Sequence, residues 1–471
     1  MILSKLAVLI LNEVAKKLAS LFGSSGVRGI VNIEVTPNLA CKIGLAIAQH
    51  TKAKTAIVGR DTRVSGDMLG DALVSGLLSM GVNVTLAGLV PTPTLAYLTK
   101  MLKADVGCML TASHNPPKYN GLKIFKKNSL SYNDEDQRAV ERIIAEKNFQ
   151  MPVWHQIGGV AYGDFNYRYI EMAKKSALLK KNWRLVLDPG CGATFEVGPS
   201  VLKATGCHIT TLNAQPDGFF PGRSPEPTNQ SLNDLSSLVK DLNADVGIAF
   251  DGDGDRAAFI NEEGSFVNFD RLLAAFAAYS LKCAGGGTVV TNVEASMCVE
   301  KMCEAVGGKV VRTKVGDVHI SEAVKRFGSV FGGEPCGAWV HPLFHYCPDG
   351  ILSAVLLLKA LEDENKTLVE FVAEVPKYST LRENLSCAGG LKYRVLKSFG
   401  KKFKSAFPEY SVFSDIDGVR LTLRNGWLLV RASGTEPLIR LTVEGESLKA
   451  AKDIMDKGIA LVQKITEELQ K

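Results

Sequence analysis

Three times before residue 340, short apolar runs alternate with helix-like segments. This alternation constrains the fold more than any other feature, because it is typical of parallel α/β units in which each helix connects two strands. An amphipathic segment at 67–80 provides the first connecting helix. The expected strands lie at 55–59, 83–88 and 104–110 in the first set, at 184–188, 208–214 and 244–250 in the second, and at 287–293, 309–317 and 328–333 in the third.

The C-terminal part follows a different pattern. Two alternating runs between 418 and 433 are joined by Asn425 and Gly426, a dipeptide that strongly favours a hairpin turn. A helix is expected at 447–469. A chain of 471 residues is too long for one ordinary core and suggests three or four domains. We therefore predict three α/β units followed by an α+β module.

The tetrapeptide Ala-Asp-Val-Gly occurs at 104 and again at 244, and each copy opens a strand that runs into a polar loop. This recurrence indicates repeated units of roughly 100 to 120 residues. In open α/β sheets, ligands bind beyond the carboxyl ends of the strands. Both polar loops are therefore expected to take part in the chemistry.

The loop after the second copy contains three aspartates at alternating positions, Asp251, Asp253 and Asp255. Three carboxylates in a tight glycine-containing loop can surround one hard cation, and Mg²⁺ is the natural one. An EF-hand and a plain solvated turn are the alternatives. Arg256 stands where an EF-hand loop needs glycine, and 257–259 reads as a new strand, so the sequence favours Mg²⁺.

Two further loops offer groups for a phosphorylated sugar. Glu334 lies between glycines at 333–337 and could reach sugar hydroxyls, although such a loop is often an ordinary turn. The segment 431–440 supplies hydroxyl, guanidinium and backbone donors that suit a phosphate dianion. These donors are Arg431, Ser433, Gly434, Thr435 and Arg440. The alternative is a hairpin end whose polar groups bond one another, and Arg28 in 23–29 is a weaker phosphate candidate.

The loop after the first copy contains Ser113 and His114. The serine could simply cap its own turn. A Ser-His hydrolase would require a G-x-S-x-G elbow and an acid partner, and neither appears here. We also expect that His114 does not readily turn its ring toward the hydroxyl of its own neighbour. Together with a metal loop and a phosphate site, Ser113 is best explained as a phosphorylated serine facing Mg²⁺.

These motifs together resemble the α-D-phosphohexomutase superfamily, which includes phosphoglucomutases, phosphomannomutases and phosphoglucosamine mutases. TASHNP, DGDGDR, GGEPCG and RASGTEP occur in the family's order, with support from 59–63, 216–227 and 314–317. The resemblance implies a heart-shaped, four-domain α/β fold with mixed sheets and a C-terminal α+β domain. The implied segments are an N-terminal extension at 1–18, domain I at 19–153, domain II at 154–254, domain III at 255–367 and domain IV at 368–471.

The resemblance also implies an activity and the residues that perform it. The enzyme would interconvert hexose 6-phosphate and hexose 1-phosphate through a phosphoserine and a hexose 1,6-bisphosphate, which also serves as activator. Ser113 and the three aspartates would hold Mg²⁺. The residues implied in phosphoryl or proton transfer are Arg28, His114, Lys123 and Arg256, beside Ser113. Those implied in substrate binding are Glu334, Cys336 and Lys314 together with the donors of 431–440.

Two positions depart from the family pattern. Cys336 stands where many members have serine, and Ala338 stands where a histidine often assists proton transfer. Lys123 is therefore the first choice as general base, with His341 or His345 as substitutes.

The segment 21–29 resembles the glucosamine branch of the family and favours phosphoglucosamine mutase, with phosphomannomutase/phosphoglucomutase as the alternative. A non-catalytic sugar-phosphate-binding paralogue is a third possibility, against which the intact serine and aspartates argue.

Composition narrows the partners and the compartment. The net charge of +6 is spread along the chain without the dense basic blocks of nucleic-acid arms. The ten cysteines form no CxxC pair and are expected to be reduced thiols. The apolar stretch near the N-terminus is too short to span a bilayer. We expect a cytoplasmic monomer or homodimer that binds small hexose phosphates, and neither nucleic acid nor membrane.

Overall fold

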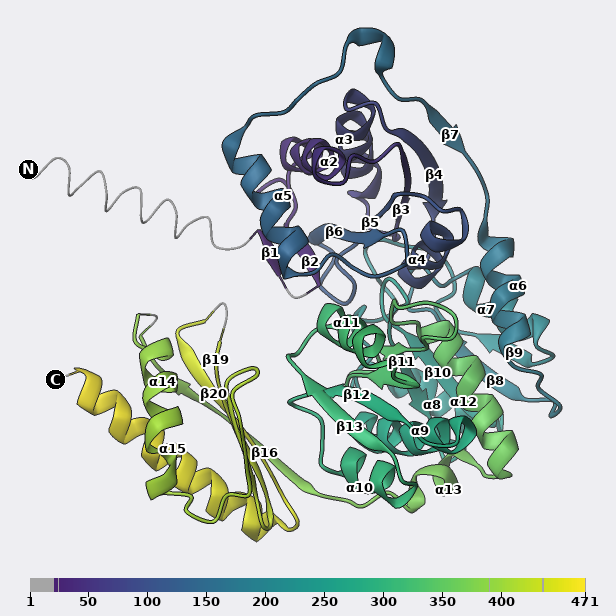
Figure 1. The fold of residues 1–471 in the computed structure, drawn as a ribbon. Coiled ribbons are helices and arrows are strands. Elements are labelled where there is room, and N and C mark those ends of the chain that lie inside the picture. Colours follow the sequence, from purple (N-terminus) through teal and green to yellow (C-terminus); the bar gives the residue numbers. More distant parts are fainter. Residues whose placement is uncertain (1–20, 24, 389, 434–435, 471) are drawn as a thin grey trace, which may run out of the picture.

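The structure is a computed structural model that describes residues 21–470 except positions 24, 389, 434 and 435. The N-terminal extension expected at 1–18 lies outside the described residues. The chain forms three α/β domains and a C-terminal domain with its own sheet and helices (Figure 1). The first domain stands above the second and third in this view, and the fourth lies to one side.

Domain I is a seven-stranded mixed sheet with helices on both faces. The order is β1-β2-β6-β5-β3-β4-β7. Ala56 and Val58 pack with α2 and α3 on one face, whereas Ile57 packs with α4 on the other. The strands are β1 (Phe22–Gly23), β2 (Gly26–Ile30), β3 (Thr55–Arg60), β4 (Asn83–Leu89), β5 (Val106–Leu110), β6 (Tyr119–Lys126) and β7 (Val160–Tyr162). The helices are α2 (Pro37–Thr51), α3 (Gly66–Ser79), α4 (Thr92–Met101), α5 (Asp134–Glu146) and the short 3-10 turn η1 (Trp154–Gln156).

Domains II and III are built on four-stranded sheets. Domain II contains α6 (Asn166–Ser176), β8 (Arg184–Asp188), α7 (Val197–Ala204), β9 (His208–Thr211), α8 (Asn233–Asp241), β10 (Val246–Phe250) and β11 (Ala257–Ile260). Domain III contains α9 (Phe269–Ala284), β12 (Thr288–Asn292), α10 (Cys298–Ala305), β13 (Lys309–Thr313), α11 (Asp317–Phe327), β14 (Phe331–Gly333), β15 (Trp339–Val340), α12 (Gly350–Glu364) and α13 (Leu368–Ala373). One hydrophobic cluster joins the two domains, since side chains of both sheets pack around α12.

The repeated units predicted from the sequence share one topology. Each contains three parallel strands in the order second, first, third, followed by an antiparallel fourth strand beside the third. These sets are β4-β3-β5-β6, β9-β8-β10-β11 and β13-β12-β14-β15. In every unit the loop between the third and fourth strands is one of the three polar loops singled out above, at 111–118, 251–256 and 334–338.

The repeated Ala-Asp-Val-Gly has a structural role in both units. Asp105 accepts hydrogen bonds from the backbone N–H groups of Lys54 and Thr55, at the start of β3. Asp245 accepts one from the N–H of Arg184, at the start of β8. The strands themselves begin at Val106 and Val246, two residues later than expected, because each aspartate turns its side chain to the neighbouring strand.

The pairing of the strands and the packing of α13 indicate where the domain boundaries lie. A boundary at 254/255 would cut the β10–β11 hairpin, and one at 367/368 would separate α13 from the domain III core into which Leu368 and Phe371 pack. We therefore propose that domain II extends through β11 and that domain III extends through α13.

Domain IV is a five-stranded antiparallel sheet covered by helices on one face. The order is β16-β20-β19-β18-β17. Its elements are β16 (Ser379–Ser386), α14 (Lys392–Lys402), η2 (Phe403–Ser405), β17 (Val412–Ser414), β18 (Val419–Leu423), β19 (Gly426–Ala432), β20 (Leu438–Gly445) and α15 (Leu448–Gln470).

The predicted hairpin of domain IV is present, but its turn was placed one residue too late. Leu423 pairs with Gly426, so Arg424 and Asn425 form the turn and Gly426 belongs to β19. A Cβ atom at Gly426 would lie 2.0 Å from the carbonyl oxygen of Glu444. The glycine is therefore required by the close approach of β20 rather than by the turn.

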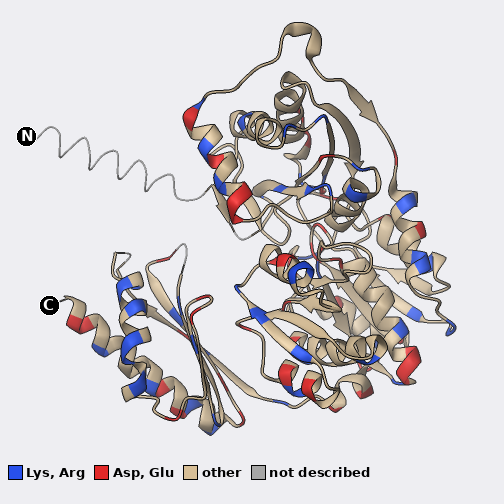
Figure 2. Ribbon diagram, in the orientation of Figure 1, with Lys and Arg blue, Asp and Glu red and all other residues tan. Residues whose placement is uncertain are grey.

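The surface and the thiols agree with the composition. Lys and Arg lie among Asp and Glu on all four domains (Figure 2). All ten cysteines are free. Among the described residues, none of the helices has the length and apolar character needed to cross a bilayer.

Candidate active site

The Ser113 loop is fixed by its own backbone. Ser113 has a φ of 50°, a left-handed conformation that non-glycine residues rarely adopt. Its N–H donates to Thr111 Oγ1 at 2.8 Å, and its hydroxyl donates to Asp251 Oδ2 of domain II at 2.6 Å. The side chain is fully buried. Such strain at a buried polar residue is typical of functional sites.

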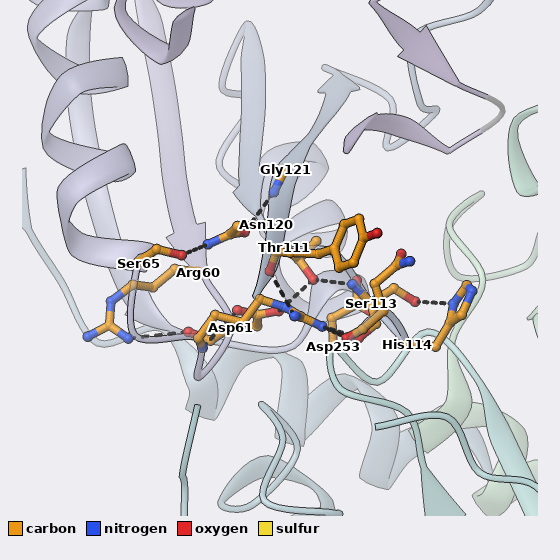
Figure 3. A network of polar contacts seen from close by, with 12 residues as sticks. Arg60, Asp61, Ser65, Thr111, Ser113, His114, Asn120, Gly121 and Asp253 are labelled. Carbon is orange, nitrogen blue, oxygen red and sulfur yellow. Dashed lines mark hydrogen bonds and ion pairs between the residues drawn. The ribbon is translucent and has the colours of Figure 1, made fainter. Parts of the chain in front are cut away.

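The conformation of Ser113 corrects one expectation. The hydroxyl lies 3.2 Å from Nδ1 of His114, and Figure 3 shows the two side chains directed at each other. The left-handed backbone at Ser113 brings neighbouring side chains to the same side of the loop. Burial and the guanidinium groups of Arg256 and Arg28 lower the pKa of His114 to about 2. The imidazole is therefore neutral near pH 7.

A buried arginine holds the serine loop in place. Arg63 is 1% exposed and pairs with Asp61 at 3.0 Å (Asp61 is labelled in Figure 3). Its guanidinium donates to four carbonyl oxygens of the loop, those of Ser113, Asn115, Pro116 and Tyr119, at 2.6–2.8 Å. Asp61 also accepts from Thr111 at 2.7 Å. The loop thus depends on one charged pair for its shape.

Replacing Arg63 by methionine should therefore loosen domain I. Removing one partner of a buried ion pair costs about 3–5 kcal/mol, because Asp61 is left charged and unpaired. We expect the β5 and β6 amides to exchange with deuterium about 100-fold faster or more, since exchange reports the free energy of opening. Arg138→Met, at an exposed position on α5, is the matched control and should change little. Equal exchange in both variants would contradict the role given to Arg63.

The aspartate loop has the properties of a cation site. Oxygens of Asp251, Asp253 and Asp255 lie within 4.8 Å of one another, and all three residues are buried. Oδ1 of Asp253 and Oδ1 of Asp255 are buried without any hydrogen-bond partner. Uncompensated oxygens so close together are costly unless a cation joins them. A set of three hard carboxylate donors fits Mg²⁺.

The charges around this loop are strongly coupled. Lys123 Nζ contacts Asp253 at 2.8 Å and Asp255 at 2.5 Å. Burial opposes the charge on Lys123, but the two carboxylates outweigh it and raise its pKa. Burial and the neighbouring aspartates raise the pKa of Asp251, whereas at Asp253 the effect of burial is outweighed by Lys123 and its pKa is lowered. Lys123 is therefore an ammonium ion in this arrangement, and it donates hydrogen bonds to both carboxylates.

A cavity of about 570 Å³ lies beside the serine loop and has walls from domains I, II and III. Five of the residues predicted to contact substrate or the transferring group line it; they are Arg28, His114, Arg256, Glu334 and Cys336. Glu294 and Asn292 line it as well, although neither was predicted. The cavity is large enough to accept a small phosphorylated sugar.

The carboxylate of Glu334 is held in position at the cavity wall. Its Oε1 accepts from Asn292 Nδ2 and from the N–H of Gly316, both at 2.8 Å. Burial raises its pKa. Burial also raises the pKa of Cys336 to about 12, so that this residue presents a neutral thiol at the position where many members of the resembling family have serine.

Of the predicted phosphate donors of domain IV, the three that the structure describes do not line this cavity. Arg431 forms ion pairs with Glu294 and, at 2.9 Å, with Asp417. Ser433 is buried and accepts from the N–H of Glu436, while Arg440 is exposed and pairs with the Glu436 side chain. Gly434 and Thr435 lie outside the described residues, and Lys314 is exposed at a position next to the cavity-lining Val315.

The two histidines considered as substitute bases lie in the core. His341 contacts Ser353 Oγ at 2.8 Å and packs among aromatic rings, and burial lowers its pKa to about 3. His345 pairs with Asp349 at 2.9 Å. Neither lines the cavity. Their positions argue for a structural role.

Sequence reasoning missed the arginines that hold the site loops. Each α/β domain contains a buried or partly buried arginine that pairs with a carboxylate and donates to several backbone carbonyls near the strand ends. These pairs are Arg63 with Asp61, Arg223 with Asp188, and Arg312 with Glu300. Thr92, whose hydroxyl donates to Asp253 at 2.6 Å, was missed as well. Arg63 and Arg223 stand in motifs that the sequence marked, but nothing local indicates which carbonyls they would bind.

Models of known families match the chain domain by domain. The matched descriptions are phosphoglucomutase/phosphomannomutase alpha/beta/alpha domain I at 19–151, domain II at 167–264, domain III at 268–378, and the C-terminal domain at 360–460. Together they span most of the chain.

Individual relatives extend this similarity. A probable phosphoglucosamine mutase of Methanopyrus kandleri is 42% identical over 95% of this chain and 99% of its own, and one of Pyrococcus abyssi is 40% identical over 94% and 97%. A phosphoglucomutase/phosphomannomutase family protein of Burkholderia thailandensis superposes with a TM-score of 0.85 at 26% identity, covering 95% and 98% of the two chains.

Proposed function

The chain belongs to the phosphoglucomutase/phosphomannomutase family and is a phosphohexomutase, and from that premise we propose that it converts glucosamine 6-phosphate to glucosamine 1-phosphate. The observation that supports catalysis is the buried Ser113 hydroxyl, 2.6 Å from Asp251 and next to His114, which lines a cavity together with Arg28 and Arg256. Glucosamine as the sugar is supported by relatives at 40–42% identity over nearly the whole chain.

The reaction we propose has two transfers. In the first, the bond between phosphorus and Ser113 Oγ breaks while the C1 hydroxyl oxygen of the hexose 6-phosphate bonds to phosphorus, which gives the 1,6-bisphosphate, and the proton of that hydroxyl passes to Ser113 Oγ. The sugar then turns over in the site. In the second, Ser113 Oγ bonds to the phosphorus of the 6-phosphate while the bond from that phosphorus to O6 breaks, and the serine proton passes to O6. Positioning and charge stabilisation provide most of the catalysis in such transfers.

The residues around Ser113 would share these tasks. His114, neutral and with Nδ1 3.2 Å from the hydroxyl oxygen, would hold Ser113 Oγ in position through a hydrogen bond. Arg28 and Arg256 would stabilise the oxygens of the transferring group. Held by Asp251, Asp253 and Asp255, Mg²⁺ would neutralise charge on that group. Lys123 would keep Asp253 and Asp255 in place through its ammonium group.

The experiment that tests the proposed function is turnover of the purified protein on three substrates. Glucosamine, glucose and mannose 1-phosphates are each supplied with their own 1,6-bisphosphate as activator. We expect the highest kcat/KM with glucosamine 1-phosphate. Preference for glucose or mannose would support the phosphomannomutase/phosphoglucomutase alternative, and no turnover of any sugar would support a non-catalytic paralogue.

Arg431 should anchor the phosphate that does not react. Both the 1-phosphate and the 6-phosphate must use this anchor in one of the two sugar orientations, so Arg431→Ala should weaken both about 10- to 100-fold by the loss of a charge-assisted contact. The assay is direct binding in a Ser113→Ala background. Arg424→Ala, at the turn of the same hairpin, is the control. Unchanged affinity for both phosphates would leave Arg431 with only its pairs to Glu294 and Asp417.

We further propose that the protein acts in the cytoplasm on small hexose phosphates. The support is the ten free cysteines, which suit a reducing compartment.

A further inference from the structure

The two sides of the substrate cavity differ in charge. Arg28 and Arg256 approach it from domains I and II, near the serine loop. Glu294 and Glu334 line it from domain III. A phosphate group suits the first side, whereas a cationic group suits the second. The cavity is therefore expected to bind a sugar that carries both a phosphate group and a cationic group.

Glu294 stands on a loop that is fixed before any ligand binds. Arg312, paired with Glu300, donates to the carbonyl oxygens of Asn292 at 2.7 Å and Ala295 at 2.9 Å. The Asn292 side chain accepts from the N–H of Glu294 at 2.9 Å and, through its amide, donates to Glu334 at 2.8 Å. The two acidic residues of the cavity are thus linked through one asparagine, which keeps their spacing constant.

The carboxylate of Glu294 is paired with the predicted phosphate anchor. Its ion-pair partner is Arg431, which also holds Asp417. The Glu294 side chain is 37% exposed, so it remains accessible from the cavity. If a substrate phosphate binds Arg431, Glu294 either shares Arg431 with the phosphate or loses this ion-pair partner. The Glu294 carboxylate then requires another positive charge nearby.

We propose that Glu294 binds the 2-ammonium group of an amino-sugar phosphate and so determines the specificity of the site. This inference rests on the proposed function. The ammonium group restores the charge balance that the phosphate disturbs at Arg431, and a 2-hydroxyl group cannot. The 2-ammonium group is on C2, which is bonded to C1. It therefore lies near Glu294 when the 1-phosphate is anchored at Arg431, and far from Glu294 when the 6-phosphate is anchored there.

The test is Glu294→Gln in a Ser113→Ala background, with binding measured by calorimetry. The probes are glucosamine 1-phosphate, glucosamine 6-phosphate, N-acetylglucosamine 1-phosphate and glucose 1-phosphate. Loss of a charged contact should weaken glucosamine 1-phosphate about 10-fold or more relative to glucose 1-phosphate. Glucosamine 6-phosphate should change less. The substitution also releases Arg431 from its ion pair, but this affects all phosphates alike. The readout is therefore the ratio between the affinities for the different sugars.

Two controls separate the outcomes. Glu304→Gln, exposed on α10, should leave every affinity unchanged. Glu294→Asp, which keeps the charge, should retain the preference for the amino sugar. Equal effects of Glu294→Gln on all four probes would overturn the inference and reduce Glu294 to a partner of Arg431. If instead the parent protein itself showed no preference for the amino sugar in turnover, the proposed function would fail independently of Glu294.

Discussion

Asp253→Asn should lower kcat by about 10³-fold while leaving KM nearly unchanged, because a metal ion contributes several kcal/mol mainly in the transition state. One oxygen of Asp253 accepts from Thr92 and Lys123, and the other is buried without a partner and directed to the aspartate cluster. Asparagine preserves the shape but presents a neutral group to the cation. A fall in kcat without a rise in KM is the signature of an interaction made only in the transition state.

The fold should survive this substitution. Asp253 lies beside two other buried carboxylates, so removing its charge relieves repulsion while Asp255 still pairs with Lys123. We expect a thermal midpoint within a few degrees of the parent, and Asp241→Asn, exposed on α8, serves as a matched control for activity. Activity that survived both chelation of divalent metals and Asp253→Asn would show that the loop is structural.

The sequence predicted the arrangement of strands well because the units are regular. Apolar runs, repeated turns and the recurring tetrapeptide all depend on local hydrophobic spacing, and each polar loop follows a strand directly. The three loops therefore lie at the corresponding edge of their own sheets, as their positions directly after strands indicated. The turn of the domain IV hairpin was predicted one residue too late, because Gly426 is required for close packing against β20 and not for the turn.

The rest of the site depends on contacts between distant segments. Arg63 binds carbonyls about fifty positions later, at Ser113 and beyond, and no periodicity indicates that pairing. The orientation of His114 follows from the left-handed backbone at Ser113, which side-chain chemistry alone does not predict. The pairing of Arg431 with Glu294 joins domains III and IV, so it depends on how two domains meet.

Ser113→Ala should reduce turnover by about 10⁴-fold or more, because removal of the group that forms the covalent intermediate leaves only binding and charge stabilisation. The variant should remain folded. It loses one hydrogen bond to Asp251, at a cost of about 1–3 kcal/mol for a buried acceptor left unpaired, and the Arg63 contacts that hold the loop use only its backbone. Ser75→Ala, exposed on α3, controls for the loss of a serine hydroxyl.

The same variant decides where the phosphate resides. The intact mass of the parent protein should include a fraction heavier by one phosphoryl group, and peptide mapping should place it on Ser113. That fraction should be absent from Ser113→Ala, because Ser113 is the hydroxyl that contacts Asp251 among the residues that the structure describes. Adding the 1,6-bisphosphate should raise the phosphorylated fraction of the parent and leave the variant unchanged. Phosphate found only at another residue of active enzyme would remove Ser113 from the mechanism, and the aspartate loop would then need a different acceptor within its reach.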